Sequence, residues 1–310
     1  MSVSLIYDPA YLTHNTGNHH PENAHRLEVV LGTLKASDIG GHLRIVKPSS
    51  ARVEDLLRCH HEEMVHHVKA LCESGSSSID ADTHISRESY EVALLAAGGA
   101  ISAVDEVMKE EGGRAFCLVR PPGHHATVER AMGFCLFNNA AVAARYAQAK
   151  YGAESVLIID WDVHHGNGTQ EIFWTDPTVF YFSTHQYPFY PGTGAASEHG
   201  AGKGEGFTLN IPLPAGTPAS IHRKVFVDAL HAIHQKFHPD LIIISAGFDS
   251  RRGDLLGGLM LEDSDFSEMT KEVLRISEQD SAGRIVGLLE GGYNLQLLGG
   301  SVKSHLTAML

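Results

Sequence analysis

The run Leu-Ile-Ile-Ile-Ser at residues 241–245 constrains the fold most strongly. It is apolar on both faces, which is typical of a parallel strand that is buried on both sides. Other short runs rich in branched residues alternate with longer amphipathic segments, and this alternation predicts an α/β fold with a mainly parallel sheet flanked by helices on both faces. We expect strands at residues 4–7, 115–119, 155–159, 179–183, 241–245 and 285–289.

Helices are expected between these strands. An apolar stripe in which Ile221, Val225, Ala229, Ile233 and Phe237 stand four residues apart predicts a helix over 218–237. Further helices are expected at 24–36, 86–111, 137–151 and 261–279. Because no repeat, low-complexity tract or Pro/Ser-rich linker divides the 310 residues, we expect a single domain over residues 1–310.

Charge and hydropathy exclude several classes of protein. The chain has 24 Lys and Arg against 37 Asp and Glu, a formal net charge of −13, which disfavours direct nucleic-acid binding. The longest apolar stretch, 92–104, is too short to span a membrane, and residues 1–9 lack the pattern of a signal peptide. The 4 cysteines form no CxxC pair, which favours reduced thiols. We therefore expect a cytoplasmic protein.

Polar or glycine-rich segments follow predicted strands at several points. They are Arg-Pro-Pro-Gly-His-His at 120–125, Asp-Trp-Asp-Val-His-His-Gly-Asn-Gly at 160–168, Gly-Phe-Asp-Ser at 247–250 and Glu-Gly-Gly-Tyr-Asn at 290–294. In open parallel sheets ligands bind beyond the carboxyl ends of the strands. We therefore expect these segments to meet at one edge of the sheet and to form the functional site.

Two carboxylates and one imidazole in these segments suit a metal ion. Asp162 and His164 alternate in an extended segment, so they can face the same point, and Asp249 follows the buried strand at 241–245. Two Asp and one His leave a position open for water, which is typical of a catalytic metal site. The alternative, that Asp162 and His164 only cap the following turn, is disfavoured by the presence of Asp249.

Histidine and tyrosine side chains supply the remaining chemistry. His124 and His125 stand in a turn that Pro and Gly make rigid, where an imidazole can move a proton between water and a leaving group. Tyr293 can donate a hydrogen bond to a carbonyl oxygen that becomes an oxyanion, or it can simply pack at the rim. Other adjacent pairs, such as His60 and His61, are expected on a helix surface. Together, the potential metal ligands, the two histidines of the turn and Tyr293 predict metal-assisted hydrolysis of an amide or ester.

These motifs resemble the zinc-dependent histone deacetylase family, including its bacterial deacetylase-like and acetylpolyamine amidohydrolase members. Pro-Pro-Gly-His-His, Asp-x-Asp-x-His-His-Gly-Asn-Gly, Tyr-Pro-Gly-Thr-Gly, Gly-Phe-Asp and Glu-Gly-Gly-Tyr recur in the family's order, after His-Pro-Glu at 20–22. Asn167, which replaces the Asp of class I enzymes, resembles class II. The resemblance implies the arginase/deacetylase fold and one histone deacetylase-like catalytic domain over residues 1–310.

The resemblance also implies the metal ions. One catalytic Zn²⁺ would be bound by Asp162, His164 and Asp249. A structural K⁺ near the zinc would use Asp160, Asp162, His164, Ser183 and Thr184. A second K⁺ would lie around Phe173, Asp176 and Val179.

The resemblance assigns the catalytic roles as follows. His125 would be the general base and acid, and His124 would assist it electrostatically. Asp160 would accept a hydrogen bond from His124, and Asn167 would be the weaker partner of His125. Tyr293 would polarise the acetyl carbonyl.

The walls of the substrate channel follow from the same resemblance. Gly133 and Phe134 would line one side and Tyr190 the other, and Arg26 matches an arginine near the internal acetate pocket. Tyr190 stands where many members have Phe, which predicts a more polar wall. Leu256 occupies a position that is acidic in polyamine-specific relatives.

We therefore expect a deacetylase whose substrate is an acylated lysine in a peptide or protein. Leucine at position 256 disfavours a small acetylated amine, although another acid at the entrance, such as Asp254, could compensate. An acetylpolyamine amidohydrolase is the nearest alternative. An arginase-like enzyme with two Mn²⁺ ions and a non-catalytic acyl-lysine binding protein are less favoured, the first because extra bridging carboxylates are not evident.

Overall fold

The computed structural model describes residues 2–109 and 111–310, and its strands form one sheet. The order of the 8 strands is β2-β1-β3-β8-β7-β4-β5-β6, and all pairings are parallel. The strands are β1 (Val3–Ile6), β2 (Leu43–Val46), β3 (Arg114–Cys117), β4 (Val156–Asp160), β5 (Val179–Gln186), β6 (Thr208–Leu213), β7 (Leu241–Ala246) and β8 (Ile285–Leu289). The predicted α/β fold with a parallel sheet is confirmed.

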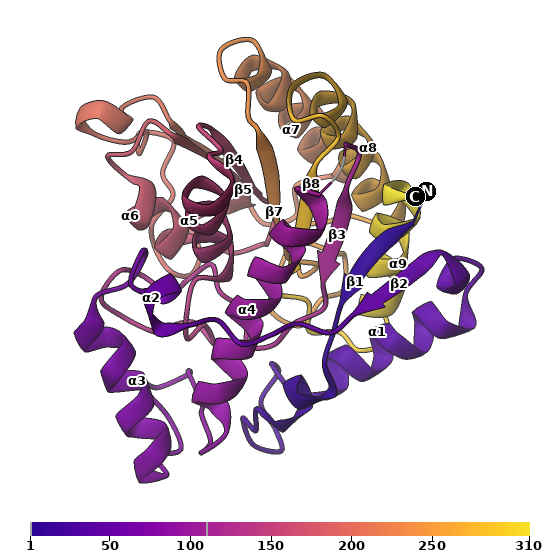
Figure 1. Ribbon diagram of the computed structural model, residues 1–310. Helices are drawn as coiled ribbons and strands as arrows, with labels where there is room; N and C mark the ends of the chain where they lie inside the picture. Colours follow the sequence, from indigo (N-terminus) through magenta and orange to yellow (C-terminus); the bar gives the residue numbers. More distant parts are fainter. Residues whose placement is uncertain (1, 110) are drawn as a thin grey trace.

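Helices cover both faces of the sheet. They are α1 (His25–Ala36), α2 (Val53–Leu56), α3 (Glu62–Ser74), α4 (Ser89–Val107), α5 (Asn139–Tyr151), α6 (Asn167–Phe173), α7 (Ala219–His234), α8 (Asp263–Asp280) and α9 (Leu298–Met309). Helices α4 and α5 pack together in front of the sheet in Figure 1, whereas α7, α8 and α9 lie behind it, with α1 against α9. The central strands are therefore shielded from water on both sides.

The central strands and the longest helices agree with the sequence predictions, whereas the edges of the sheet do not. Strands β2 and β6, which the sequence did not predict, are the two edge strands. An edge strand need not be apolar on both faces: β2 is partly exposed along its whole length, and β6 includes Asn210 and Pro212. Helices α2, α3, α6 and α9 were also not predicted. Helix α4 ends at Val107, and residue 110 of the predicted helix lies outside the described residues.

The register of the central strands brings the predicted site segments together. Strands β4, β7 and β8 are buried along their whole length. Asp160 at the end of β4 pairs with Ser245 of β7, and Ala246 at the end of β7 pairs with Leu289 of β8. Because the strands are parallel, the segments that follow them start at the same edge of the sheet.

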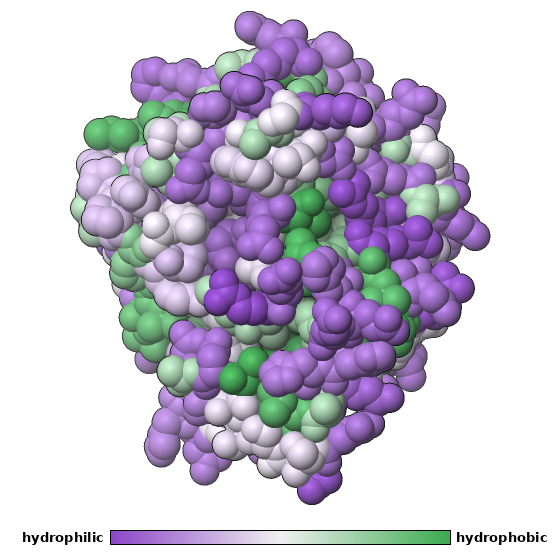
Figure 2. All heavy atoms as spheres, turned by 90° about the vertical axis from the view of Figure 1, so that its left-hand side faces the viewer, coloured by the Kyte–Doolittle hydropathy of each residue, from purple (hydrophilic) through white to green (hydrophobic). Residues whose placement is uncertain are grey.

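The surface agrees with the composition. Hydrophilic side chains cover most of the face shown in Figure 2, and the apolar patches between them are small. Within residues 2–109 and 111–310, no helix combines the length and the apolarity that a membrane crossing requires. All four cysteines are free and buried.

Candidate active site

Three potential metal ligands lie together where β4 and β7 end. Asp162, His164 and Asp249 are all buried, and their donor atoms lie within 4.8 Å of one another. His164 Nδ1 is 3.0 Å from Asp162 Oδ1 and 3.2 Å from Asp249 Oδ2. That Asp249 oxygen is buried without a hydrogen-bond partner, which is the state of a carboxylate oxygen that is free to bind a cation.

The electrostatics of this cluster favour a positive charge. Burial lowers the pKa of His164, but Asp162 and Asp249 outweigh burial and raise this pKa to about 10. Burial, followed by the charge of Asp162, raises the pKa of Asp249 to about 7. Two buried carboxylates and an imidazole form a donor set that suits Zn²⁺ with a coordination position left open, so these residues fit the ion expected from the sequence.

Glycines allow the backbone to approach both carboxylates closely. A Cβ atom at Gly291 would lie 2.0 Å from Asp249 Oδ2, and one at Gly247 would lie 2.1 Å from Asp162 Oδ2. The Gly291 N–H instead donates to Asp162 Oδ2 at 2.8 Å, and the Val163 N–H donates to Asp249 Oδ1 at 2.8 Å. These hydrogen bonds fix the orientation of the two carboxylates.

The paired histidines of the 120–125 turn lie next to the cluster and have different partners. The centroids of the His124 and His125 rings are 4.0 Å apart. His124 Nδ1 donates to Asp160 Oδ2 at 3.0 Å, and His125 Nδ1 donates to Asn167 Oδ1 at 2.8 Å. Since an amide oxygen only accepts, this contact assigns the proton of His125 to Nδ1 and leaves Nε2 as an acceptor.

Burial and neighbouring charges separate the protonation states of these histidines. Burial lowers the pKa of His124, but the surrounding carboxylates, above all that of Asp160, raise it to about 10. Burial lowers the pKa of His125 well below its usual value, and the positive charges of His124 and His164 lower it further. Near neutral pH, His124 is therefore a cation and His125 is a neutral proton acceptor.

Glu290 holds the histidine turn in place, a role that the sequence reasoning missed. It is fully buried, and its Oε2 accepts the N–H of Gly123 at 2.7 Å and that of His124 at 3.2 Å. Ser245 donates its hydroxyl to Oε1 at 3.1 Å, which connects the turn to β7. Burial raises the pKa of Glu290 to about 7. Its place directly after a buried strand and before two glycines was the available signal.

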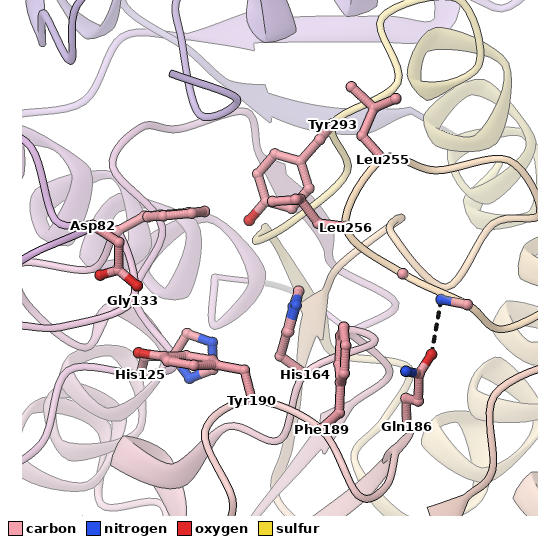
Figure 3. Close-up of a pocket in the computed structure, with 13 residues that line it drawn as sticks. Asp82, His125, Gly133, His164, Gln186, Phe189, Tyr190, Leu255, Leu256 and Tyr293 are labelled. Atoms are coloured by element: carbon pink, nitrogen blue, oxygen red, sulfur yellow. Dashed lines mark hydrogen bonds between the residues drawn. The ribbon is translucent and has the colours of Figure 1, made fainter. Parts of the chain in front are cut away.

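A cavity of about 500 Å³ opens onto these groups. Gly133, Phe134, Tyr190 and Leu256, the residues predicted for the channel, all line it together with His125, His164 and Tyr293. The side chains in Figure 3 converge on this space from several segments, and the Tyr293 hydroxyl points into it. Sequence reasoning did not single out Asp82, Gln186, Phe189 and Leu255, which also line the cavity.

The ring of Tyr293 packs against Phe134 and against the guanidinium of Arg26. Tyr293 is 5% exposed, its ring centroid is 5.8 Å from that of Phe134, and the Arg26 guanidinium lies 5.0 Å from its ring. Burial raises the pKa of Tyr293 well above its usual value, so its hydroxyl keeps its proton. Arg26 is fully buried and donates to the Gly292 carbonyl at 2.7 Å and to Glu22 at 3.1 Å. Arg26 therefore lies beneath Tyr293.

Asp254, considered from the sequence as an acid at the cavity entrance, binds backbone N–H groups instead. Its Oδ2 accepts the backbone N–H groups of Tyr293 at 2.7 Å and Asn294 at 3.0 Å, and its Oδ1 accepts that of Leu256 at 2.9 Å. Asp254 does not line the cavity, so it does not replace the missing acid at position 256. The carboxylate that does line the cavity is that of Asp82.

The residues of the first predicted potassium site are neighbours in the sheet. Asp160 pairs in register with Ser183 at the ends of β4 and β5, and Thr184 follows; all three are buried. At the second predicted site, the Asp176 carboxylate lies 2.6 Å from Arg145 Nη1 and is already paired. Both potassium sites stay predictions.

His60 corrects the expectation of an idle surface histidine. It is only 3% exposed. Its Nδ1 donates to the carbonyl of Thr127 at 2.8 Å, and its Nε2 accepts the N–H of Asn138 at 2.9 Å. His60 therefore connects the segment behind His125 to the start of α5. Its neighbour His61 is exposed, as expected.

Comparisons with known proteins identify the family. The histone deacetylase domain family matches residues 20–309. A probable deacetylase of Archaeoglobus fulgidus is 41% identical over 96% of this chain and 82% of that protein. A histone deacetylase-like amidohydrolase of Pseudomonas aeruginosa is 39% identical over 88% of this chain and 72% of that protein. The crystal structure of the HDA15 HD domain superimposes with a TM-score of 0.91 at 37% identity, over 99% of this chain and 88% of that one. The chain belongs to the histone deacetylase family.

Proposed function

We propose that this hydrolase is a zinc-dependent amidohydrolase that removes acetyl, or another short acyl group, from the Nε of lysine in a peptide or protein. One observation carries the proposal. His164 of the Asp162–His164–Asp249 cluster, neutral His125 and Tyr293 all line the same cavity. A metal ligand set, a base and an oxyanion donor around one space are what hydrolysis of an amide requires.

Asp162, His164 and Asp249 would hold the ion, and a bound Zn²⁺ supplies Lewis-acid activation of water and of the acyl carbonyl. His125 accepts the proton of the attacking water at Nε2, because its Nδ1 is engaged with Asn167.

The remaining residues stabilise charge and complete the proton transfer. His124, held as a cation by Asp160, places a positive charge beside His125 as the oxyanion develops. Tyr293 donates its hydrogen bond to that oxyanion. His125 then gives its proton to the nitrogen of the leaving amine, so the C–N bond breaks and a carboxylate and a free amine are released.

The cavity walls support acyl-lysine as the substrate. Phe134, Phe189 and Tyr190 provide aromatic faces for the alkyl chain, and Leu256 contributes no charge. The Asp82 carboxylate is suited to accept a backbone N–H of a bound peptide. The same carboxylate would also attract the cationic end of a small acetylated amine, so acetylpolyamine hydrolysis is the second candidate function.

Other parts of the proposal rest on the sequence and on the family. We propose a single catalytic domain over residues 1–310, one or two structural K⁺ ions, the first near Asp160 and Ser183, and a cytoplasmic location.

A substrate comparison tests the proposal directly. The purified protein is expected to hydrolyse a fluorogenic acetyl-lysine peptide, to lose this activity on chelation and to regain it when zinc is restored. N-acetylputrescine, assayed in parallel, is expected to be the poorer substrate, because Leu256 contributes no charge and Asp82 is the one carboxylate among the described residues that line the cavity. Turnover of N-acetylputrescine alone would favour the second candidate. Full activity after complete removal of metal would contradict the proposed chemistry.

Asp254→Asn is expected to lower kcat by about tenfold to a hundredfold, because misplacing a catalytic group by an ångström has an effect of this size. Asp254 accepts three N–H groups that fix Tyr293 and Leu256, and an amide cannot accept them all. Zinc content is expected to stay unchanged. The matched control, Asp82→Asn, is expected to raise KM for the peptide and to keep kcat. A wild-type kcat for Asp254→Asn would remove Asp254 from the positioning of Tyr293.

A further inference from the structure

A group of two histidines and one aspartate lies at the amino edge of the sheet, opposite the candidate active site. His234 is the last residue of α7, and His238 lies in the connection to β7, which begins at Leu241. Asp280 is the last residue of α8, shortly before β8 begins at Ile285. The catalytic segments follow the carboxyl ends of these same two strands, so the two groups stand at opposite ends of the sheet.

The two imidazoles point at one carboxylate. His234 Nδ1 lies 2.6 Å from Asp280 Oδ2, and His238 Nδ1 lies 3.0 Å from Asp280 Oδ1. One donor atom of each of the three residues lies within 4.8 Å of the others. The imidazole rings are nearly perpendicular, at 88°, with centroids 5.7 Å apart. Three donors from three segments thus converge on one point.

The three side chains differ in their exposure to solvent. The Asp280 side chain is 7% exposed, whereas that of His238 is 66% exposed. An ion can therefore reach the donors from solvent on the His238 side, while the carboxylate that contacts both imidazoles is buried. A neutral imidazole with its proton on Nε2 presents its Nδ1 lone pair to a metal, so binding requires only the other tautomer of each ring.

We propose that His234, His238 and Asp280 form a second metal site for a late first-row divalent cation such as Zn²⁺. Two imidazoles and one carboxylate are a common ligand set for such ions, with water completing the coordination. The site would join the end of α7 to the end of α8, two helices that lie side by side behind the sheet (Figure 1). A bound ion would stabilise the folded protein there without taking part in catalysis.

Zinc stoichiometry of the full, tag-free chain tests the site. After dialysis against free Zn²⁺, the wild type is expected to hold two equivalents by elemental analysis. Asp280→Asn and His238→Ala are each expected to lose one equivalent and to keep wild-type deacetylase activity. His238 is largely exposed, so its replacement keeps the test valid if Asp280→Asn does not fold.

Two further variants make the result specific. His231→Ala is the matched control, because His231 is an exposed histidine of the same helix whose Nε2 lies 3.9 Å from Glu272, and among the described residues it belongs to no potential metal-binding group. It is expected to keep both equivalents. Combining Asp280→Asn with Asp249→Ala is expected to remove both.

The outcomes separate this site from the proposed function. An active enzyme that binds only one zinc ion, or an Asp280→Asn variant that still binds two, would overturn the second site and show that the three residues form only a hydrogen-bonded link between helices. An inactive wild type that binds two ions, one of them lost in His238→Ala, would support the second site and contradict the proposed function.

Discussion

Tyr293→Phe is expected to lower kcat for an acetyl-lysine peptide by about a hundredfold to a thousandfold, the usual effect of removing one oxyanion donor. The substitution deletes only the hydroxyl that points into the cavity. The ring would keep its packing against Phe134 and over Arg26, so binding of the metal and the shape of the cavity are expected to persist. Steady-state kinetics and zinc analysis of the same preparation measure both quantities.

Tyr190→Phe provides the matched control on the opposite wall of the cavity. Tyr190 also lines the cavity, and its ring stands perpendicular to that of His125 at 5.1 Å. It is 37% exposed, however, and its hydroxyl has no proposed chemical role. Removing that hydroxyl is expected to change kcat only a few-fold. Near-normal turnover of Tyr293→Phe would exclude Tyr293 from the mechanism.

Asp249→Ala is expected to abolish both zinc binding and turnover. It removes one of three ligands and leaves only Asp162 and His164, which are too few to retain the ion through dialysis. Because burial and Asp162 raise the pKa of Asp249 to about 7, its removal relieves an unfavourable charge, and the fold is expected to persist. Elemental analysis measures the loss of zinc, and circular dichroism checks that the fold persists.

The control for this variant is Asp228→Ala, which removes an exposed carboxylate of α7 that pairs with Lys224. It is expected to keep its zinc and its activity. If Asp249→Ala retained a full equivalent at the catalytic site, with Asp280 also replaced to exclude the second site, the ligand assignment would be wrong.

The centre of the fold was predictable from the sequence because its strands are buried on both faces. A run such as residues 241–245, which is apolar on both faces, is stable only as a strand covered on both sides. The carboxyl ends of such strands mark the edge of the sheet where ligands bind. The edge strands β2 and β6 carry no such signal, because each is paired on one side only. Helix α9 starts with Leu-Gly-Gly, a weak helix former, and depends on packing against α1 and α8.

The site was predictable where its residues directly follow strands. Asp162, His164 and Asp249 meet because the register of β4 and β7 requires it. Asp82 lies in a segment that directly follows helix α3 and not a strand. Tertiary contacts such as the Phe134 N–H that donates to Thr83 at 3.3 Å hold this segment at the cavity. No local pattern encodes a contact of that kind. The same holds for His60, whose partners lie more than sixty residues away.

The position of β8 has a consequence for how the protein is made. This strand is the last of the sheet in sequence, yet it lies between β3 and β7. Without β8, the strands β2-β1-β3 and β7-β4-β5-β6 share no pairing, and β3 and β7 each have an unpaired edge. A nascent chain that still lacks β8 is therefore expected to be prone to aggregation. Insertion of β8 closes both edges and, in the same event, delivers Glu290 and Tyr293 to the site.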